Sequence, residues 1–263
     1  MAASSDSDRR GVALVTGGRR GIGKAIALAL AEEGFAVAVN AETDADDLHA
    51  TVAEIVAMGV PALALVGDVA ELAGHEALLD AAEARLGPLT TLVNNAGVGV
   101  LERGDPLDVT PASFDRCLAV NARAVFFLSQ CFARRLLGRP RDAARHHAIV
   151  TITSANAEAV ALNRAEYAVS KAAASMATRA FAARLGAAGI DVYEVRPGVI
   201  ATDMTAPALD DYRRRIEAGL TLTPRVGQPA DVGAAVATLA SGRLPYATGQ
   251  AIHVDGGLAL ARF

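Results

Sequence analysis

The sequence predicts a single α/β domain in which a doubly wound, parallel sheet of seven strands carries helices on both faces. Short apolar runs recur along the chain, and segments with apolar residues at helical spacing separate them, as is typical of parallel strands joined by right-handed crossovers. The first apolar run ends in a glycine-rich turn, which is where ligands meet sheets of this kind. The chain has 263 residues, 52% of them hydrophobic, and can therefore bury one large core.

Composition argues against several classes of function. The formal net charge is −4, the isoelectric point is near 5.8 and tryptophan is absent, so we expect no nucleic-acid partner. Residues 1–10 are polar and are expected to form a flexible tail, and no apolar run approaches membrane-spanning length. We therefore expect a cytoplasmic protein that does not enter a membrane. No group of side chains has the spacing of metal ligands, so no metal site is expected.

The domain, expected over residues 11–263, begins with the apolar run Val12–Thr16. Gly17, Gly21 and Gly23 follow, and a helix with regular apolar spacing then runs to Gly34. Glycines suit a turn in which the backbone must let a phosphate approach the N-terminus of a helix, whose free N–H groups attract negative charge. A simple tight turn is the alternative. The place of the glycine cluster after the first strand and before a helix favours dinucleotide binding.

The same alternation continues to the end of the chain. After the first pair, the predicted strands are 36–39, 62–66, 92–95, 148–152, 190–195 and 251–255, and the predicted helices are 45–58, 72–86, 110–137, 165–185 and one that begins at Pro229. Asp68 follows the third strand, where its carboxylate could meet an adenine amino group or cap the next helix. The fourth strand runs into a turn of small residues at Ala96 and Gly97 that leaves room for a cofactor.

The fifth strand and the helix after it are expected to deliver reactive side chains to one edge of the sheet. The strand ends at Ser154, and the helix over 165–185 carries Tyr167 and Lys171, four residues apart and so on one helical face. An ammonium beside a phenol favours the phenolate and lowers the phenol's pKa, which would fit the pair for acid/base work. The spacing by itself also occurs by chance.

Two further segments are open to more than one interpretation. Asn121 falls within the predicted helix 110–137, which Thr110 caps and Pro111 opens. Asparagine disfavours helix interiors, so either its side chain is exposed or the helix is locally distorted, and from the residues alone we expect exposure. Residues 203–223 are mixed in character and could form a mobile lid over a pocket.

Taken together, these pieces resemble the short-chain dehydrogenase/reductase family, with its Rossmann-type fold, over nearly the whole chain. The matching pieces are Thr16–Gly23, Asp68, Asn94–Gly97, Asn121, Ser154, Tyr167–Lys171, Pro197–Gly198 and Thr202. The resemblance implies that Tyr167 exchanges a proton with a hydroxyl/carbonyl pair and that Ser154 hydrogen-bonds the reacting oxygen. It also implies that Lys171 lowers the tyrosine's pKa and holds the nicotinamide ribose. Asn121 would anchor a water that leads protons to solvent.

The resemblance also implies which residues contact the cofactor. They are Gly17, Arg19, Arg20, Gly21, Ile22, Gly23, Asn40, Ala41, Glu42, Asp68, Val69, Asn95, Ala96, Gly97, Tyr167, Lys171, Pro197, Gly198, Ile200 and Thr202. At the end of the second strand, the acid that usually selects NAD is replaced by Ala41. Arg19 supplies positive charge that suits the 2′-phosphate of NADP, whereas Glu42 opposes it. The balance favours NADP(H) over NAD(H).

The activity implied is that of an NAD(P)-dependent oxidoreductase, most similar to the 3-oxoacyl carrier-protein reductases. An acyl carrier protein is then an expected partner, with Arg134 near the active-site mouth, although Ala188 stands where a second arginine is expected. A sugar, polyol or steroid alcohol dehydrogenase is the first alternative, and a silent dinucleotide-binding sensor or scaffold is the second. In the family, homotetramers often form through the two long helices, here 110–137 and 165–185.

Overall fold

The computed structural model describes residues 10–140, 142 and 144–261, and its centre is a sheet of seven parallel strands. The order across the sheet is β3-β2-β1-β4-β5-β6-β7, so the predicted fold class is confirmed. Except for Arg10, the expected N-terminal tail lies outside the described residues. The strands are β1 (Gly11–Val15), β2 (Phe35–Ala41), β3 (Ala62–Val66), β4 (Thr91–Asn94), β5 (Ala148–Ile152), β6 (Asp191–Pro197) and β7 (Ala251–Val254).

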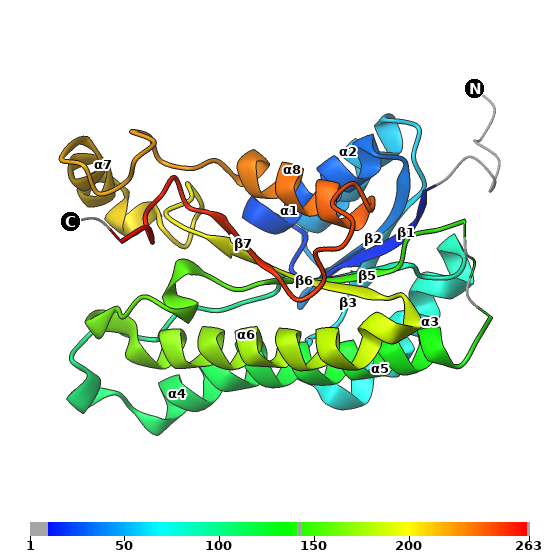
Figure 1. Cartoon of the computed structure of the whole chain (residues 1–263), viewed down its shortest axis with the longest axis horizontal. Helices are drawn as coiled ribbons and strands as arrows, with labels where there is room; N and C mark the ends of the chain where they lie inside the picture. Colours follow the sequence, from blue (N-terminus) through cyan, green and yellow to red (C-terminus); the bar gives the residue numbers. More distant parts are fainter. Residues whose placement is uncertain (1–9, 141, 143, 262–263) are drawn as a thin grey trace.

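Helices cover both faces of the sheet (Figure 1). One layer contains α1, α2 and α8, and the opposite layer contains α3, α4, α5 and α6. The helices are α1 (Gly21–Glu32), α2 (Asp46–Ala57), α3 (His75–Leu86), α4 (Pro111–Leu118), α5 (Val125–Leu137), α6 (Ala165–Leu185), α7 (Leu209–Glu217) and α8 (Pro229–Ala240).

The central strands are buried on both sides because each face of the sheet meets a helical layer. On β1, Val12 and Leu14 join the core beneath α5 and α6, whereas Ala13 and Val15 join the core beneath α1 and α8. Alternate residues of a strand point to opposite faces, so the run Gly11–Val15 is apolar throughout.

The strand order reverses between β1 and β4, and this places a crevice at their carboxyl ends. Beyond β1, the hydroxyl oxygen of Thr16 accepts hydrogen bonds from the backbone N–H groups of Asn95 and Ala96, both at 3.0 Å. The side-chain amide of Asn95 in turn donates to the carbonyl oxygens of Thr16, at 2.9 Å, and Gly17, at 3.0 Å. These bonds fix the glycine turn against the turn that follows β4.

The predicted helix 110–137 is interrupted by a π-helical turn, Ala119–Ala124, between α4 and α5. Asn121 lies in this turn with 0% of its surface exposed, so the expectation of an exposed side chain is wrong and the alternative of a local distortion holds. The wider turn carries the asparagine inward, where its amide finds partners in the loop after β4 and on α6.

Two kinds of arrangement are absent from the part of the chain that the structure describes. None of its helices is long and apolar enough to cross a membrane. Its His, Cys, Asp and Glu side chains also form no group of three or more that could hold a metal ion.

Candidate active site

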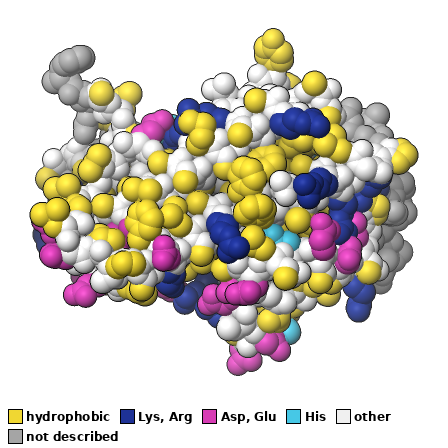
Figure 2. All heavy atoms as spheres, turned by 90° about the horizontal axis from the view of Figure 1, so that it is seen from below, with side chains coloured by type: hydrophobic (Ala, Val, Ile, Leu, Met, Phe, Trp, Pro, Cys, Tyr) yellow, Lys and Arg dark blue, Asp and Glu magenta, His cyan; other side chains and the backbone are white. Residues whose placement is uncertain are grey.

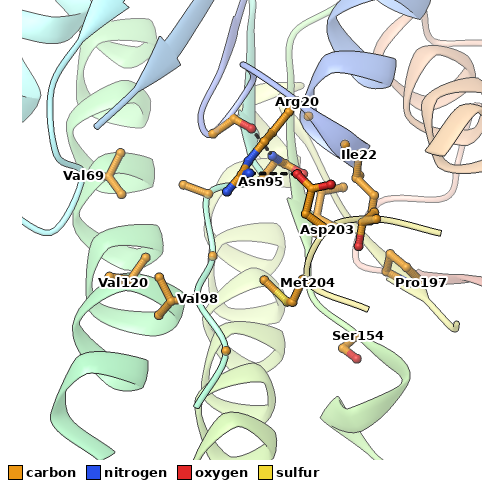
Figure 3. A pocket seen from close by; sticks show the side chains of 18 of the residues that line it. Arg20, Ile22, Val69, Asn95, Val98, Val120, Ser154, Pro197, Asp203 and Met204 are labelled. Carbon is orange, nitrogen blue, oxygen red and sulfur yellow. Dashed lines mark hydrogen bonds and ion pairs between the residues drawn. The ribbon is translucent and has the colours of Figure 1, made fainter. Parts of the chain in front are cut away.

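A cavity of about 440 Å³ opens at the carboxyl edge of the sheet, at the crevice where the strand order reverses (Figure 3). A volume of this size suits an extended small molecule. Every residue that the sequence predicts for cofactor contact lines this cavity, as do Ser154, Tyr167 and Lys171. Asn121 does not line it and lies behind its wall.

In the glycine turn at one end of the cavity, Gly17 and Gly23 stand where a side chain has no room. Gly17 has φ +62°, and a Cβ atom there would lie 2.8 Å from the Cα of Ala96. A Cβ on Gly23 would lie 2.1 Å from the carbonyl oxygen of Gly17. The turn leads directly into α1, whose first backbone N–H groups lack helical partners. The residues present therefore fit the diphosphate of a dinucleotide.

Next to this turn, the end of β2 combines one cation with several acids. The guanidinium of Arg19 lies 3.4 Å from the hydroxyl of Thr43 and 3.7 Å from a carboxylate oxygen of Asp47. Ala41 is buried, whereas Glu42 is exposed. A positive side chain thus stands beside the strand end, and its nearest acid is Asp47 rather than Glu42.

Asp68 occupies the cavity rim beyond β3. One of its carboxylate oxygens accepts a hydrogen bond from the backbone N–H of Ala70 at 2.8 Å. It thus stabilises the turn before the short helical segment Leu72–Gly74, which precedes α3. The capping interpretation matches this contact, and the contact with adenine stays a prediction.

Tyr167, Ser154 and Lys171 meet at the wall opposite the glycine turn. The ammonium of Lys171 lies 5.7 Å from the ring centroid of Tyr167 and donates to the carbonyl oxygen of Ile152 at 3.0 Å. The Ser154 hydroxyl caps a short helical turn by accepting from the N–H of Asn156 at 3.1 Å. Two elements, the end of β5 and the start of α6, therefore supply this group.

Burial changes the protonation of this group in a direction that the sequence did not predict. Burial raises the pKa of Tyr167, although a hydrogen bond with Ser154 opposes the rise. Burial also lowers the pKa of Lys171 to about 8, against the attraction of Cys117 and Glu194. The pKa of Tyr167 is therefore raised rather than lowered as expected, because burial of the phenol outweighs the groups that favour the phenolate.

Asn121 fixes the loop after β4 against α6. Its side-chain oxygen accepts from the N–H of Val98 at 2.8 Å, and its amide nitrogen donates to the Val98 carbonyl and to the Ser170 hydroxyl, both at 2.9 Å. Gly97 makes this approach feasible, since a Cβ there would lie 3.2 Å from the Asn121 side-chain oxygen and 3.4 Å from the Lys171 ammonium. The asparagine thus lies next to the lysine without lining the cavity.

A buried ion pair supports the segment that carries Ser154. Glu194 and Arg196 lie on β6 with 2% and 5% of their surface exposed, and the Arg196 Nε donates to Glu194 at 2.7 Å. Glu194 also accepts hydrogen bonds from Thr153, at 2.6 Å, and from Ser175, at 2.8 Å. Arg196 reaches Glu158 in an ion pair. Burial opposes ionisation of Glu194, but its partners outweigh this and keep its pKa below the ordinary value.

An ion pair also crosses the mouth of the cavity. Arg20, from the glycine turn, contacts a carboxylate oxygen of Asp203 at 2.8 Å, and Met204 lies beside it (Figure 3). Asp203 is the first residue of the predicted lid, so the lid segment and the glycine turn touch in this structure.

Sequence reasoning missed the pair on β6 and the contribution of Arg116 to the cavity wall. Glu194 and Arg196 carried a usable signal, because two opposite charges at alternate positions of a strand between buried apolar residues indicate a buried pair. Arg116 carried no such signal, because its place in the cavity wall depends on a hydrogen bond from its guanidinium to the carbonyl oxygen of Gly99, 17 residues away, at 3.0 Å.

Comparisons with known proteins place this architecture among reductases and dehydrogenases. A family model described as enoyl-(acyl carrier protein) reductase matches residues 17–259. A 3-oxoacyl-(acyl-carrier-protein) reductase of Staphylococcus aureus is 36% identical over 249 residues, which are 94% of this chain and 97% of the relative.

Solved structures agree over the same length. A 3-oxoacyl-(acyl-carrier protein) reductase from Brucella melitensis in complex with NAD is 42% identical with a TM-score of 0.93, covering 97% of this chain and 99% of that one. A gluconate 5-dehydrogenase from Burkholderia cenocepacia in complex with NADP and tartrate is 32% identical with a TM-score of 0.87, covering 97% of this chain and 96% of that one.

Proposed function

The chain belongs to the short-chain dehydrogenase/reductase family of oxidoreductases, which act on a CH–OH group with NAD(P), and we propose that it reduces the ketone of a 3-oxoacyl thioester. The observation that carries this proposal is the convergence of Ser154, Tyr167 and Lys171 on one wall of a cavity whose far end is a glycine turn built for phosphate. The relatives named as 3-oxoacyl carrier-protein reductases support the substrate class.

The proposed proton donor is the phenol of Tyr167. Because burial raises its pKa, this phenol keeps its proton at neutral pH and can pass it to a ketone oxygen as negative charge develops there. The Ser154 hydroxyl donates a second hydrogen bond to the same oxygen. A bound NAD(P)H supplies the hydride that the substrate carbon accepts.

Behind the phenol, we propose that Lys171 stabilises the charge and that a water near Asn121 carries the proton. Below its pKa of about 8, Lys171 carries a charge that stabilises the phenolate left after proton transfer. We propose that the same ammonium binds a ribose hydroxyl of the cofactor. The Asn121 side chain is already committed to Val98 and Ser170, so we assign the proton-carrying water to the neighbourhood of the π-helical turn rather than to the amide itself.

We propose NADP(H) as the preferred cofactor. The support is Arg19 beside the end of β2, the small buried Ala41 at the position of the usual acid, and Glu42 on the exposed loop. A guanidinium there can bind a 2′-phosphate, whereas an acid on a loop is less fixed than one on the strand. The relatives with NAD and with NADP bound support either choice.

An acyl carrier protein is a proposed partner. Arg134 is exposed at the end of α5 and carries a charge suited to an acidic partner, but Ala188 offers none. We also propose that residues 203–223 act as the lid, with the Arg20 and Asp203 pair as one of its closed contacts. A homotetramer and a cytoplasmic location complete the proposal.

A sugar-acid or polyol dehydrogenase is the second candidate, and the relative that holds NADP and tartrate is the observation that favours it. A steroid-type alcohol dehydrogenase would use the same chemistry. A silent sensor or scaffold is disfavoured, because Asn121, Ser154, Tyr167 and Lys171 are all present.

A turnover screen of the purified protein tests these alternatives. An acetoacetyl thioester, a keto sugar acid and a cyclic ketone are each offered with NADPH and with NADH, and loss of the reduced nicotinamide is followed. We expect the thioester to be reduced with the highest kcat/KM, and NADPH to be preferred. Turnover of the sugar acid alone would establish the second candidate. A tenfold preference for NADH, about 1.4 kcal/mol, would mean that Glu42 decides the cofactor.

A further inference from the structure

Three arginines surround one tyrosine at the end of the molecule where α6 begins. Tyr212 lies on α7, which is at the same end as the start of α6 (Figure 1). Its hydroxyl accepts a hydrogen bond from Arg164 at 3.2 Å, and the guanidinium carbon of Arg215 lies 5.9 Å from its ring centroid. Arg103, from the loop after β4, lies close enough to lower the pKa of the phenol. These four residues form the arginine–tyrosine cluster.

The charges of this cluster are not neutralised by carboxylates in the part of the chain that the structure describes. On the same helix, Arg213 pairs with Asp210 at 2.9 Å and Arg214 pairs with Asp211 at 3.0 Å. Among the described residues, Arg103, Arg164 and Arg215 form no such ion pair with a carboxylate. Three like charges around one phenol repel one another, so an added anion would be attracted strongly.

Two further observations indicate that the cluster is incomplete. Burial raises the pKa of Tyr212, yet Arg164 and Arg103 outweigh burial and hold this pKa below the ordinary value. The Nε atom of Arg164 is buried and has no hydrogen-bond partner among the described residues. Buried polar atoms are normally paired, so an unpaired guanidinium nitrogen in a cationic cluster calls for an acceptor.

The cluster lies beside the proposed catalytic group. Arg164 is the residue immediately before α6, and its charge opposes the rise in the pKa of Tyr167, on which Tyr212 also acts. Val98 and Gly99, which precede Arg103 in the chain, line the cavity, as does the segment Asp203–Thr205, which precedes Tyr212. The four cluster residues do not line the cavity themselves, so a substrate held at Tyr167 would contact them only with a part that extends beyond the cavity.

We propose that the arginine–tyrosine cluster binds an anionic group of the substrate, a carboxylate or a phosphate, and so selects for negatively charged ketones. Planar guanidinium groups bind both anions through paired hydrogen bonds. This inference rests on the proposed function as a ketone reductase. The anion has two sources, the carboxylate of a short oxo acid and the phosphate of a pantetheine arm.

Two pairs of substrates, each with one charged and one neutral member of similar structure, test whether the enzyme recognises the negative charge. Acetoacetate is compared with methyl acetoacetate, and the acetoacetyl thioester of 4′-phosphopantetheine is compared with that of pantetheine. For each pair, kcat/KM of the charged substrate is divided by kcat/KM of the neutral substrate. In Arg103→Gln this ratio should fall about tenfold for one of the two pairs. The pair that responds shows whether the bound anion is a carboxylate or a phosphate. In the control Arg213→Gln, whose arginine is paired with Asp210, both ratios should stay within about twofold. Unchanged ratios in Arg103→Gln would overturn the proposal.

A binding measurement keeps this inference separate from the proposed function. Calorimetry measures the binding of acetoacetate to protein that is saturated with oxidised cofactor. The binding of inorganic phosphate is measured separately in the same way. The cofactor occupies the glycine turn, so the remaining anion site should bind at least one probe about tenfold more weakly in Arg103→Gln than in Arg213→Gln. If no ketone is turned over but this difference is found, the proposed function fails and the anion site stands. Equal binding by the two variants would refute the site, whatever the protein turns over.

Tyrosine ionisation supplies a second readout. The chain has four tyrosines and no tryptophan, so tyrosinate absorbance is not obscured. An anion held by Arg103 and Arg164 reduces their effect on Tyr212, so saturating acetoacetate or phosphate should raise the pKa of the first tyrosine to titrate. Loss of this titration in Tyr212→Phe assigns it, and an unchanged midpoint in the presence of both probes would contradict binding at the cluster.

Discussion

Lys171 is a buried cation whose hydrogen-bond partner is the carbonyl of Ile152 rather than the phenol that it was expected to assist. The four-residue spacing correctly places it near Tyr167, at 5.7 Å from the ring centroid. Spacing carries no information about burial, which is created by β5 and the loop after β4. The direction of both pKa shifts therefore depends on segments that are distant in sequence, and the Tyr167 shift was predicted wrongly.

Tyr167→Phe tests the proposed proton donor. The ring still packs, but the transferable proton is lost, so kcat should fall by roughly 10² to 10⁴-fold while the dissociation constant of the cofactor changes little. Steady-state kinetics and fluorescence titration of the reduced nicotinamide measure the two quantities. Turnover close to that of the unaltered protein would rule out Tyr167 as the acid.

The pKa of Lys171 predicts a pH dependence for ketone reduction. A lysine with a pKa of about 8 is charged below that pH and neutral above it, and only the charged form stabilises the phenolate. The value of kcat/KM for the reduced cofactor reports groups of the free enzyme, so it should be constant at neutral pH and fall as pH rises through 8. In Lys171→Met the value should be low throughout, with this inflection absent. A profile in the unaltered protein without an inflection near pH 8 would contradict the assignment.

Among the elements, the long helices show what local patterns can and cannot predict. Thr110 and Pro111 open α4 as expected, and α5 ends at Leu137 as expected. The π-helical turn between them was one of two alternatives, and exposure of Asn121 was wrongly preferred. An asparagine within a helix indicates either an exposed side chain or a local distortion. Whether its amide turns inward depends on Val98 and Ser170, which lie outside this helical segment.

Strand β6 was predicted by its apolar run, and its charged pair is expected to position the segment that carries Ser154. Arg196→Met leaves Glu194 buried without its partner, so the free energy of unfolding should fall by about 3 to 5 kcal/mol in urea denaturation. The double variant Glu194→Leu/Arg196→Met removes both charges and should recover much of this stability.

The kinetics of the double variant distinguish positioning from simple stabilisation. Thr153 and Glu158 lose their partners on β6, so the segment that carries Ser154 is held less firmly. We expect kcat to stay reduced by about tenfold or more, with cofactor affinity unchanged, at a temperature where the double variant is folded. Full recovery of kcat along with stability would show that the pair serves the fold alone.

For the whole molecule, the alternation of strands and helices was enough to predict the sheet, because parallel strands buried on both faces must be apolar throughout and few topologies join them. The cavity was predictable as well, since every expected cofactor residue lies at or beyond the carboxyl end of a strand or on the helix next to it. The arginine–tyrosine cluster was not predictable, because Arg103, Arg164 and Tyr212 come from three separate connections. Only the packing of α7 brings them together.

The face formed by α4, α5 and α6 is the surface on which we expect copies of this chain to associate. Hydrophobic side chains spread across this face between charged ones (Figure 2), and Val169 and Met176, seven residues apart on α6, are 48% and 58% exposed. Exposed apolar residues gathered on one pair of helices mark an interaction surface, and a two-fold interface brings each patch against its own copy.

Lysines at this face should therefore break the assembly. The chain mass is 26.9 kDa, and a tetramer should elute with about four times that mass in light scattering. Val169→Lys/Met176→Lys buries two charges per chain at the contact and should yield dimers or monomers, because unpaired buried charges cost several kcal/mol. Val56→Lys, on α2 in the opposite helical layer, is the matched control, since Val56 is 53% exposed and should tolerate a charge. If the double variant keeps the mass of the unaltered protein, or if Val56→Lys dissociates it equally, the contact lies elsewhere on the molecule.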